Sequence, residues 1–369
     1  MFTYTGDYIK HQNSISKAIY YTFTPRLLTQ ENLYSPDDEC NDLLIEAHRE
    51  VGILEGMSLY LPDKDILQEF MLLKESYYSY RIDYGDIDFV SMLIDIGTGK
   101  NSEKIQNIIS AYSLAFTKKT DMSNLPVVCS AAMYGSESKQ KVIIRNEPLF
   151  LNNTATNLRQ YNPTAPEQIN AALKDMTHFL DNDQANILTK AALLHYQFEM
   201  IHPFTSFNGI VGRILIYKIL HDAQLNAVRY MSLSEYLYHN KDDYFEKLTS
   251  TQQNGNYLHW IKFILNAIIE SVKYSIGQIN NYETIIKKDE CKINACEETT
   301  EKTIEVYRYF KKYLFSNVKN LSDELHISYN TASTAIQLLS KLGIIEQAST
   351  GSRNRIFAYS ELSNLFLNG

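Results

Sequence analysis

The chain has 369 residues, of which 44% are hydrophobic and 21% are charged, and its formal net charge is −8. This composition predicts a packed globular core throughout, and the length favours more than one domain. The acidic balance excludes the basic surface that a protein binding nucleic acid over its whole length would carry.

The cysteines give no sign of a metal site or of disulfides. Cys40, Cys129, Cys291 and Cys296 lack cysteine or histidine partners at the spacing of a zinc site, so we expect reduced, structural thiols. The first residues, MFTYTGDYIKHQ, do not resemble a signal peptide. No apolar run approaches the ~18 residues that span a bilayer. We therefore expect a soluble, cytoplasmic protein with no membrane partner.

Residues 1–115 are predicted to form an N-terminal helical region. Residues 1–35 are expected to be irregular, with a turn at Pro25, and Asn41 is a plausible cap for the first helix. Apolar residues at spacings of three and four predict that helix and a second one after Pro62. A third helix is expected over about 101–116.

Residues 116–286 are predicted to form a helical core with a small β-hairpin. The β-branched run KVIIR, 141–145, predicts a strand of that hairpin or an edge strand. Thr164-Ala-Pro-Glu167 has the pattern of a capping box with proline in the first turn of a helix. Further helices are expected over 185–201, about 233–248 and about 256–278.

The C-terminal residues differ in character. Residues 287–301 are charged and not amphipathic, which indicates a linker. Residues 302–369 then predict a helix, a helix-turn-helix and a β-wing, that is, a winged-helix domain. The expected element boundaries are helix caps at Ser322 and Ser328, a helix end at Gly343 and a hairpin turn over 349–354.

This C-terminal module carries a modest excess of Lys and Arg over Asp and Glu. Its polar and basic residues that could touch DNA are Tyr329, Asn330 and Thr331 at the start of the second helix, and Arg353 and Arg355 on the wing. Because few cations are clustered, docking to protein is as good an interpretation as DNA binding, and we expect any DNA binding to be weak.

The most informative stretch is EMIHPFTSFNGIVGRILIYKIL, residues 199–220. Pro203 ends one helix, and a glycine-bearing loop then opens the next, whose free backbone N–H groups attract an anion. Arg213, about one turn in, can add bidentate phosphate contacts. His202 is placed to take a proton from a hydroxyl that attacks a bound phosphate. The alternative is a tight interhelical loop around a structural histidine.

These residues resemble the signature of the Fic family, His-Pro-Phe-x-Asp/Glu-Gly-Asn-Gly-Arg-x-x-Arg. The matching positions are His202, Pro203, Phe204, Asn208, Gly209 and Arg213. Ser206 stands in place of the acid, Phe207 in place of a glycine and Ile210 in place of the first arginine. The resemblance extends over about 40–365 and implies a mainly α fold: a Fic-type helical core with a β-hairpin flap, followed by a winged helix.

The resemblance implies a protein adenylyltransferase. His202 would be the general base that activates a Ser, Thr or Tyr hydroxyl, which attacks the α-phosphate of ATP and receives AMP. The nucleotide would be bound by Asn208, Gly209, Gly212 and Arg213. Mg²⁺ would be held through the ATP phosphates alone, since Ser206 is a weaker ligand than a carboxylate.

The departures from the signature imply a weakened site. Ile210 removes one cation from the phosphate tail, and Phe207 places a bulky side chain where the backbone should approach the ligand closely. Losing a metal contact and a phosphate clamp removes transition-state stabilisation.

A second family feature implies autoinhibition. Some members carry Ser/Thr-x-x-x-Glu-Gly/Asn on an N-terminal helix, and the matching stretch here is Ser79-Tyr80-Arg81-Ile82-Asp83-Tyr84. Ser79 and Asp83 share one helical face. The resemblance implies that Asp83 reaches Arg213 and blocks the γ-phosphate position. The alternative is that Asp83 is a solvated surface acid.

Three functional hypotheses follow. The first is AMP transfer from ATP to an unidentified target protein by a weakened site. The second is a pseudoenzyme that binds a nucleotide or a protein, and the third is a winged-helix DNA-binding regulator whose Fic core acts as a sensor. Intact His202 and Arg213 favour the first over the second, and the net charge disfavours the third. A homodimer is compatible with each of them.

Overall fold

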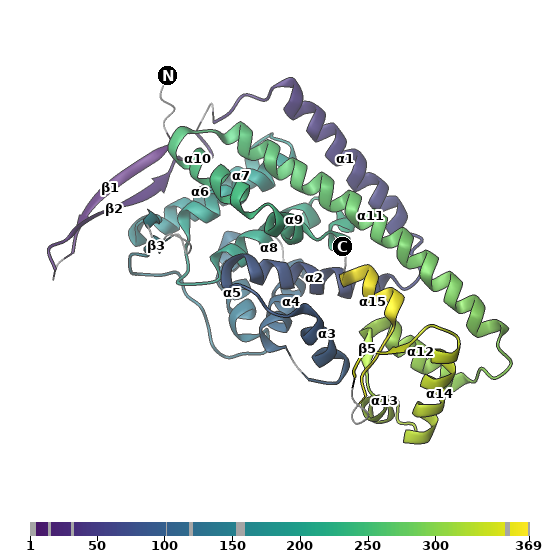
Figure 1. The fold of residues 1–369 in the computed structure, drawn as a ribbon. Coiled ribbons are helices and arrows are strands. Elements are labelled where there is room, and N and C mark those ends of the chain that lie inside the picture. Colours follow the sequence, from purple (N-terminus) through teal and green to yellow (C-terminus); the bar gives the residue numbers. More distant parts are fainter. Residues whose placement is uncertain are drawn as a thin grey trace. The chain divides into compact units, whose positions relative to one another are not determined.

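The computed structural model describes residues 5–13, 16–30, 33–100, 102–117, 121–152, 159–350 and 355–367. Figure 1 shows a mainly helical chain, as predicted. It divides into two compact units. The first comprises Met1–Leu59, Met71–Gly85 and Lys104–Val272, and the second Tyr60–Phe70, Asp86–Glu103 and Lys273–Gly369. Two helices, α2 (Lys64–Tyr84) and α11 (Tyr257–Ala295), contribute residues to both units.

The first unit begins with a hairpin that the sequence analysis missed. Strand β1 (Gly6–Gln12) pairs antiparallel with β2 (Ile19–Pro25), so the expectation of an irregular segment with a turn at Pro25 is wrong. The backbone N–H of Phe23 donates to the carbonyl of Asn162 at 2.8 Å. Because part of what fixes β2 lies about 140 residues away in the chain, its local sequence does not reveal it.

The predicted N-terminal helices are present. Helix α1 (Asp38–Ser58) is capped by Asp37, whose side chain accepts from the Cys40 N–H, and not by Asn41. Helix α2 begins two residues after Pro62, and α4 covers Glu103–Phe116. Three helices were missed: α5 (Leu125–Tyr134) in the first unit, and α3 (Phe89–Gly97) and α15 (Ser360–Leu367) in the second.

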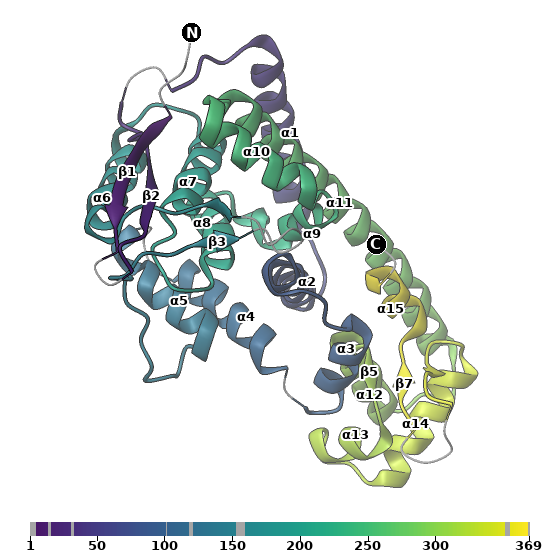
Figure 2. The same ribbon diagram turned by 60° about the vertical axis from the view of Figure 1, so that its left-hand side comes forward.

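Two buried helices, α7 (Ile187–Ile201) and α8 (Asn208–Asp222), form the centre of the first unit, where they lie side by side in Figures 1 and 2. Helix α6 (Pro166–Asn182) packs on α7. The predicted capping box is absent, because the Thr164 hydroxyl donates to the Phe23 carbonyl (3.3 Å) instead of capping α6. The remaining short elements of this unit are η1 (Met122–Asn124), η2 (Asn226–Tyr230), α9 (Leu233–His239) and α10 (Lys241–Asn254).

The flap strand was predicted in the wrong place. Residues 141–145 form no strand, because their backbone bonds elsewhere: Val142 N–H donates to the Ser130 hydroxyl within α5, and Arg145 N–H donates to the Pro203 carbonyl just after α7. The small hairpin of this region is instead β3 (Leu151–Asn152) with β4 (Arg159–Tyr161).

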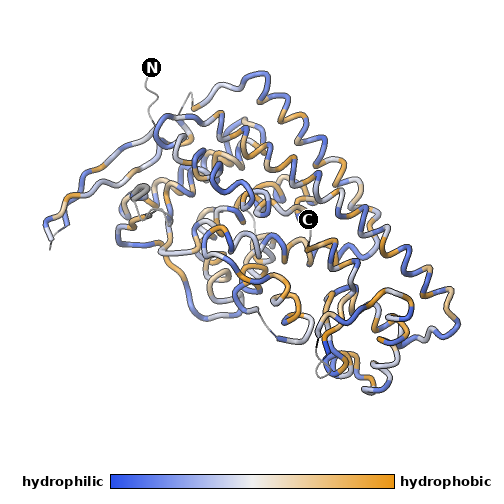
Figure 3. Tube along the Cα trace, in the orientation of Figure 1, coloured by the Kyte–Doolittle hydropathy of each residue, from blue (hydrophilic) through white to orange (hydrophobic). Residues whose placement is uncertain are grey.

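The second unit contains the end of α11 and a mixed C-terminal module. Helix α11 continues to Ala295, so residues 287–295 of the predicted linker are helical. In Figure 3, hydrophobic and hydrophilic residues alternate around α11. The module contains α12 (Glu301–Tyr313), β5 (Phe315–Ser316), α13 (Val318–Glu324), α14 (Tyr329–Lys341), β6 (Glu346–Gln347), β7 (Phe357–Ala358) and α15 (Ser360–Leu367).

The three short strands of this module form one sheet in the order β5-β7-β6. Ser328 caps α14 and Gly343 follows its end at φ +69°, as predicted, whereas Ser322 lies inside α13. Residues 351–354 of the expected turn, with Arg353, lie outside the described residues. The winged-helix assignment stays a prediction. Among the described residues, no helix combines the length and apolarity needed to cross a bilayer.

Candidate active site

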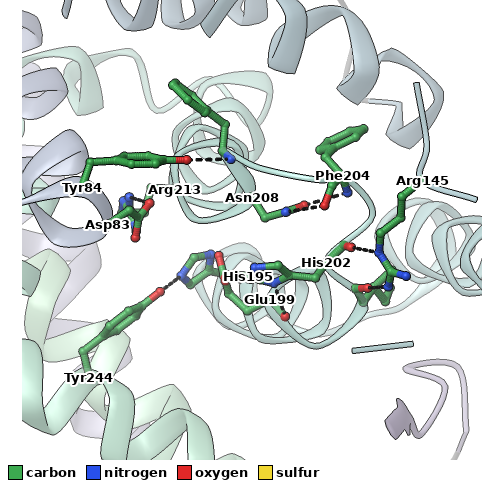
Figure 4. Close-up of polar contacts among 12 residues, drawn as sticks. Asp83, Tyr84, Arg145, His195, Glu199, His202, Phe204, Asn208, Arg213 and Tyr244 are labelled. Atoms are coloured by element: carbon green, nitrogen blue, oxygen red, sulfur yellow. Dashed lines mark hydrogen bonds and ion pairs between the residues drawn. The ribbon is translucent and has the colours of Figure 1, made fainter. Parts of the chain in front are cut away.

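His202 lies directly after the last turn of α7, in a left-handed conformation (φ +48°). Its Nδ1 is 2.7 Å from the backbone carbonyl oxygen of Glu199 (Figure 4). Because a carbonyl oxygen only accepts hydrogen bonds, Nδ1 must carry the hydrogen, and the neutral ring keeps its lone pair on Nε2. Burial lowers the pKa of His202 to about 4, so the ring is a neutral base at physiological pH.

Arg145 braces the loop that holds His202, and the sequence analysis did not assign it a role. Its guanidinium donates to the carbonyls of Ile201 (3.1 Å), His202 (2.7 Å) and Thr164, and its own N–H donates to the Pro203 carbonyl. The last carbonyls of a helix lack intrahelical partners and carry partial negative charge. Arg145 supplies the donors for them and fixes the backbone around the histidine.

The loop from Phe204 to Asn208 is closed by a reciprocal pair of hydrogen bonds. Asn208 Oδ1 accepts from the Phe204 N–H (2.9 Å), and Asn208 Nδ2 donates to the Phe204 carbonyl (2.8 Å). The Phe204 ring is fully buried and anchors the loop in the core. The Asn208 side chain is thus engaged in holding the loop, while its backbone opens α8.

The N-terminus of α8 is occupied by a carboxylate. The Asp83 oxygens lie 2.6 and 2.9 Å from the place where a Cβ of residue 209 would stand, so only glycine fits there. Arg213 Nη2 donates to Asp83 Oδ2 at 2.8 Å, and the guanidinium also bonds to the hydroxyl (2.9 Å) and the carbonyl (2.7 Å) of Ser79. Helix α2 therefore presents Ser79 and Asp83 to Arg213, as predicted.

Burial alone would lower the pKa of Arg213. Asp83, Tyr244 and Glu199 more than offset this and hold the pKa above its ordinary value. The cation therefore stays charged at this helix N-terminus, where it attracts an anion.

A buried polar cluster lies behind this pair, and the sequence analysis missed it. Tyr244 hydroxyl and His195 Nε2 are 2.9 Å apart. Burial raises the pKa of the Glu199 carboxyl to about 8, against the opposite effect of Arg213, and lowers that of His195 to about 3. Glu199 Oε2 is 3.7 Å from His202 Nδ1, but both groups are neutral near pH 7, so this contact is not an ion pair.

Gly212 belongs to this cluster. A Cβ at residue 212 would stand 2.5 Å from Glu199 Oε1 and 3.0 Å from His195 Nδ1. The glycine therefore allows α7 and α8 to approach closely, and this packing explains its presence without a nucleotide. The available signals for the cluster were the spacing of His195 and Glu199 within one helix and of His202 three residues further, just past its end.

The positions that depart from the signature are engaged in packing. Ser206 donates its hydroxyl to Met133 Sδ at 3.6 Å, and Ile210 is fully buried. Within the described residues, no three His, Cys, Asp or Glu side chains converge as a metal site would require. These residues do not fit a metal ion held by the protein at the position of the missing acid.

Residues 127–220, from α5 to near the end of α8, match the model of the Fic/DOC family. A probable protein adenylyltransferase of Aquifex aeolicus is 25% identical over 136 residues, which are 35% of this chain and 40% of the relative. A protein adenylyltransferase of Caenorhabditis elegans is 34% identical over 65 residues, 16% of this chain and 13% of the relative. The chain thus spans less than half of the length of either relative.

Among solved structures, a Fic family protein from Desulfovibrio desulfuricans has a similar fold. The superposition has a TM-score of 0.60 and covers 89% of this chain and 98% of that one, at 16% sequence identity. At this identity the likeness concerns the fold alone.

Proposed function

Because the chain belongs to the Fic/DOC family, we propose that it transfers AMP from ATP to a hydroxyl side chain of a target protein. The observation that supports this most directly is the tautomer of His202. Its Nδ1–H is fixed on the Glu199 carbonyl (2.7 Å), so that Nε2 is left as the proton acceptor.

In the proposed reaction, the target hydroxyl oxygen forms a bond to the α-phosphorus of ATP while its proton passes to His202 Nε2. The bond between the α-phosphorus and the bridging oxygen breaks, and pyrophosphate leaves with that electron pair. During the transfer the Glu199 carbonyl holds the imidazole through Nδ1, and Arg145 holds the backbone of His202 through its carbonyl.

The phosphates of ATP would bind at the N-terminus of α8, where backbone N–H groups and Arg213 favour negative charge. Asp83 takes that position in the structure, with its carboxylate against Gly209 and Arg213. We propose that Asp83 is an internal competitor of ATP and that the protein is autoinhibited until Asp83 leaves.

Mg²⁺ bound to the phosphates of the incoming ATP would neutralise part of their charge. The chain itself offers a serine hydroxyl at the place of the usual acid, and this hydroxyl bonds to Met133. Ile210 cannot clamp a phosphate. These two features favour a slow enzyme, and they also support the alternative of a pseudoenzyme that binds nucleotide without transferring it.

We also propose a cytoplasmic location and an unidentified protein target. Cys40, Cys129, Cys291 and Cys296 are free thiols, which suits a reducing compartment. Weak DNA binding by residues 302–369 is proposed only as a secondary property, since Tyr329 is exposed at the start of α14 but few cations accompany it.

The test measures transfer of label from α-labelled ATP to proteins of a lysate in the presence of Mg²⁺ or Mn²⁺. All variants carry Asp83→Gly, so that the Asp83 carboxylate does not compete with ATP. Asp83→Gly should transfer label, and Asp83→Gly/His202→Ala should not. Asp83→Gly/His178→Ala, which removes an exposed histidine on α6, is the matched control and should stay active. Equal transfer with and without His202 would refute the assigned base. ATP binding without any transfer would favour the pseudoenzyme.

A further inference from the structure

The two aromatic residues that replace small residues of the family pattern meet in the structure. Tyr84 follows Asp83 at the end of α2, and Phe207 precedes Asn208 at the start of α8. Their ring centroids are 5.0 Å apart, and the backbone N–H of Phe207 donates to the Tyr84 hydroxyl oxygen at 2.9 Å. Figure 4 labels Tyr84 and draws the hydrogen bond of its hydroxyl as a dashed line.

Phe207 holds a conformation that suits glycine. It lies at φ +63° and ψ +13°, in the left-handed region, where a residue with a large side chain is strained. Such strain persists only where the surroundings hold the residue in place. The Tyr84 ring and hydroxyl are contacts that do so, one to the side chain and one to the backbone.

Tyr84 is itself held from the other side. Its ring stacks on Tyr80, one turn earlier on α2, with centroids 5.1 Å apart and an interplanar angle of 29°. The Lys104 ammonium donates to the Tyr80 hydroxyl at 3.2 Å. The ring contacts therefore continue from Phe207 to Tyr84 and Tyr80 on α2, and a hydrogen bond from Lys104 connects Tyr80 to α4.

The contact also uses a backbone donor of the proposed phosphate site. The Phe207 N–H immediately precedes α8, in the loop whose N–H groups would face the phosphates of ATP. In the structure its acceptor is a phenol oxygen. One residue earlier in α2, the Asp83 carboxylate lies against Gly209. Two consecutive residues thus occupy two neighbouring parts of the same site.

We propose that Tyr84 and Phe207 form a second, charge-independent lock that keeps the last turn of α2 on the N-terminus of α8. The lock rests on the proposed function, in that the site it closes is the ATP site. Removing the Asp83 carboxylate then opens the site only in part, because the phenol and both rings remain. Full opening requires the loss of both contacts.

The experiment compares wild type, Tyr84→Phe, Asp83→Gly and the double variant. Tyr134→Phe, at a partly exposed tyrosine on α5, is the matched control. Amide hydrogen exchange at Phe207, followed by NMR without ATP, should quicken by about fivefold to tenfold in Tyr84→Phe, as the loss of one hydrogen bond predicts. Tyr134→Phe should exchange like wild type.

ATP affinity, measured by calorimetry, should rise further in the double variant than in Asp83→Gly, again by about fivefold to tenfold. Unchanged exchange at Phe207 in Tyr84→Phe would overturn the lock, as would equal ATP affinity in the double variant and Asp83→Gly. If neither wild type nor any of the variants binds ATP, the proposed function fails. The amide exchange rates at Phe207 still decide whether the lock exists.

Discussion

Arg213 and Asp83 form an ion pair between the core helix α8 and the end of α2, with Nη2 and Oδ2 2.8 Å apart and side chains 1% and 21% exposed. Removing one partner of a buried pair usually strands the other charge. Here Arg213 keeps both bonds to Ser79 when Asp83 is lost. The guanidinium would therefore stay in place and be available to a phosphate.

The first prediction concerns this pair. Asp83→Gly and Asp83→Asn should each tighten ATP binding by about tenfold, since a coupling of this size is typical between competing sites. The gain is modest because Ser206 and Ile210 are unchanged. Calorimetry measures the affinity, and thermal unfolding with and without ATP shows whether the variants gain more from the ligand than wild type. Equal affinities would mean that Asp83 does not compete with ATP.

The second prediction concerns pH and activity. Since burial holds the pKa of His202 at about 4, the base is neutral throughout the physiological range. Transfer by Asp83→Gly should vary little with pH between about 5.5 and 8 and should fall only as the pH approaches 4. A rate that halves near pH 6.5, the ordinary histidine value, would contradict the burial of the imidazole.

The third prediction concerns pH and stability. The folded-state pKa of His202 lies below the ordinary 6.5, so the unfolded chain takes up the proton first. The contribution of His202 to the free energy of unfolding is therefore at its full value above pH 6.5. It falls as the pH drops below 6.5 and is lost once the pH has passed through 4. His202→Gln should therefore lose less stability than wild type between pH 7 and 4.5, as measured by urea unfolding. Identical losses would show that His202 does not titrate in this way.

The fourth prediction concerns the packing of α7 on α8. Gly212→Ala should destabilise the fold by about 1–3 kcal/mol, because its Cβ would overlap the buried Glu199 and His195. Gly277→Ala in α11, where no atom lies within 4 Å of the new Cβ, should instead gain about 0.5–1 kcal/mol from helix propensity. Denaturant unfolding compares the two. A Gly212→Ala protein as stable as wild type would contradict the close approach.

The fifth prediction concerns restoration of the family signature. Ser206→Asp with Phe207→Gly should raise ATP affinity in the presence of Mg²⁺, since a carboxylate is added and the left-handed position receives glycine. Adding Ile210→Arg should reverse the benefit and lower the melting temperature, because that side chain is fully buried and would carry its charge into the core. Calorimetry and thermal unfolding of both variants separate the two effects.

The local parts of the site could be predicted from the sequence. Pro203 ends a helix and Gly209 opens another by rules that act over a few residues. The pairing of Asp83 with Arg213 could be predicted only because a family pattern linked two distant segments. Arg145 and Tyr244 escaped notice because each meets its partner 49 to 57 residues away in the chain, and no local periodicity encodes such a contact.

The strand expected at 141–145 was also mispredicted because its contacts lie outside the local sequence. Its β-branched residues favour extended backbone, and the backbone is indeed outside any helix. Its N–H groups donate to the Ser130 hydroxyl and the Pro203 carbonyl, and not to a neighbouring strand. Propensity therefore correctly disfavoured a helix in this segment, but the strand that it predicted does not form.

The missing side chain at Gly209 makes room for the Asp83 carboxylate, and it would make room for a phosphate in place of that carboxylate. A phosphate can approach α8 there only because no Cβ stands in the way, and the Asp83 carboxylate uses the same gap. A substitution at residue 209 that expels the carboxylate would also exclude the nucleotide. Variants that open the site must therefore change the end of α2 or its contact at Phe207. A genetic screen for gain of activity should recover substitutions at Asp83, Tyr84 or Phe207 and none at Gly209.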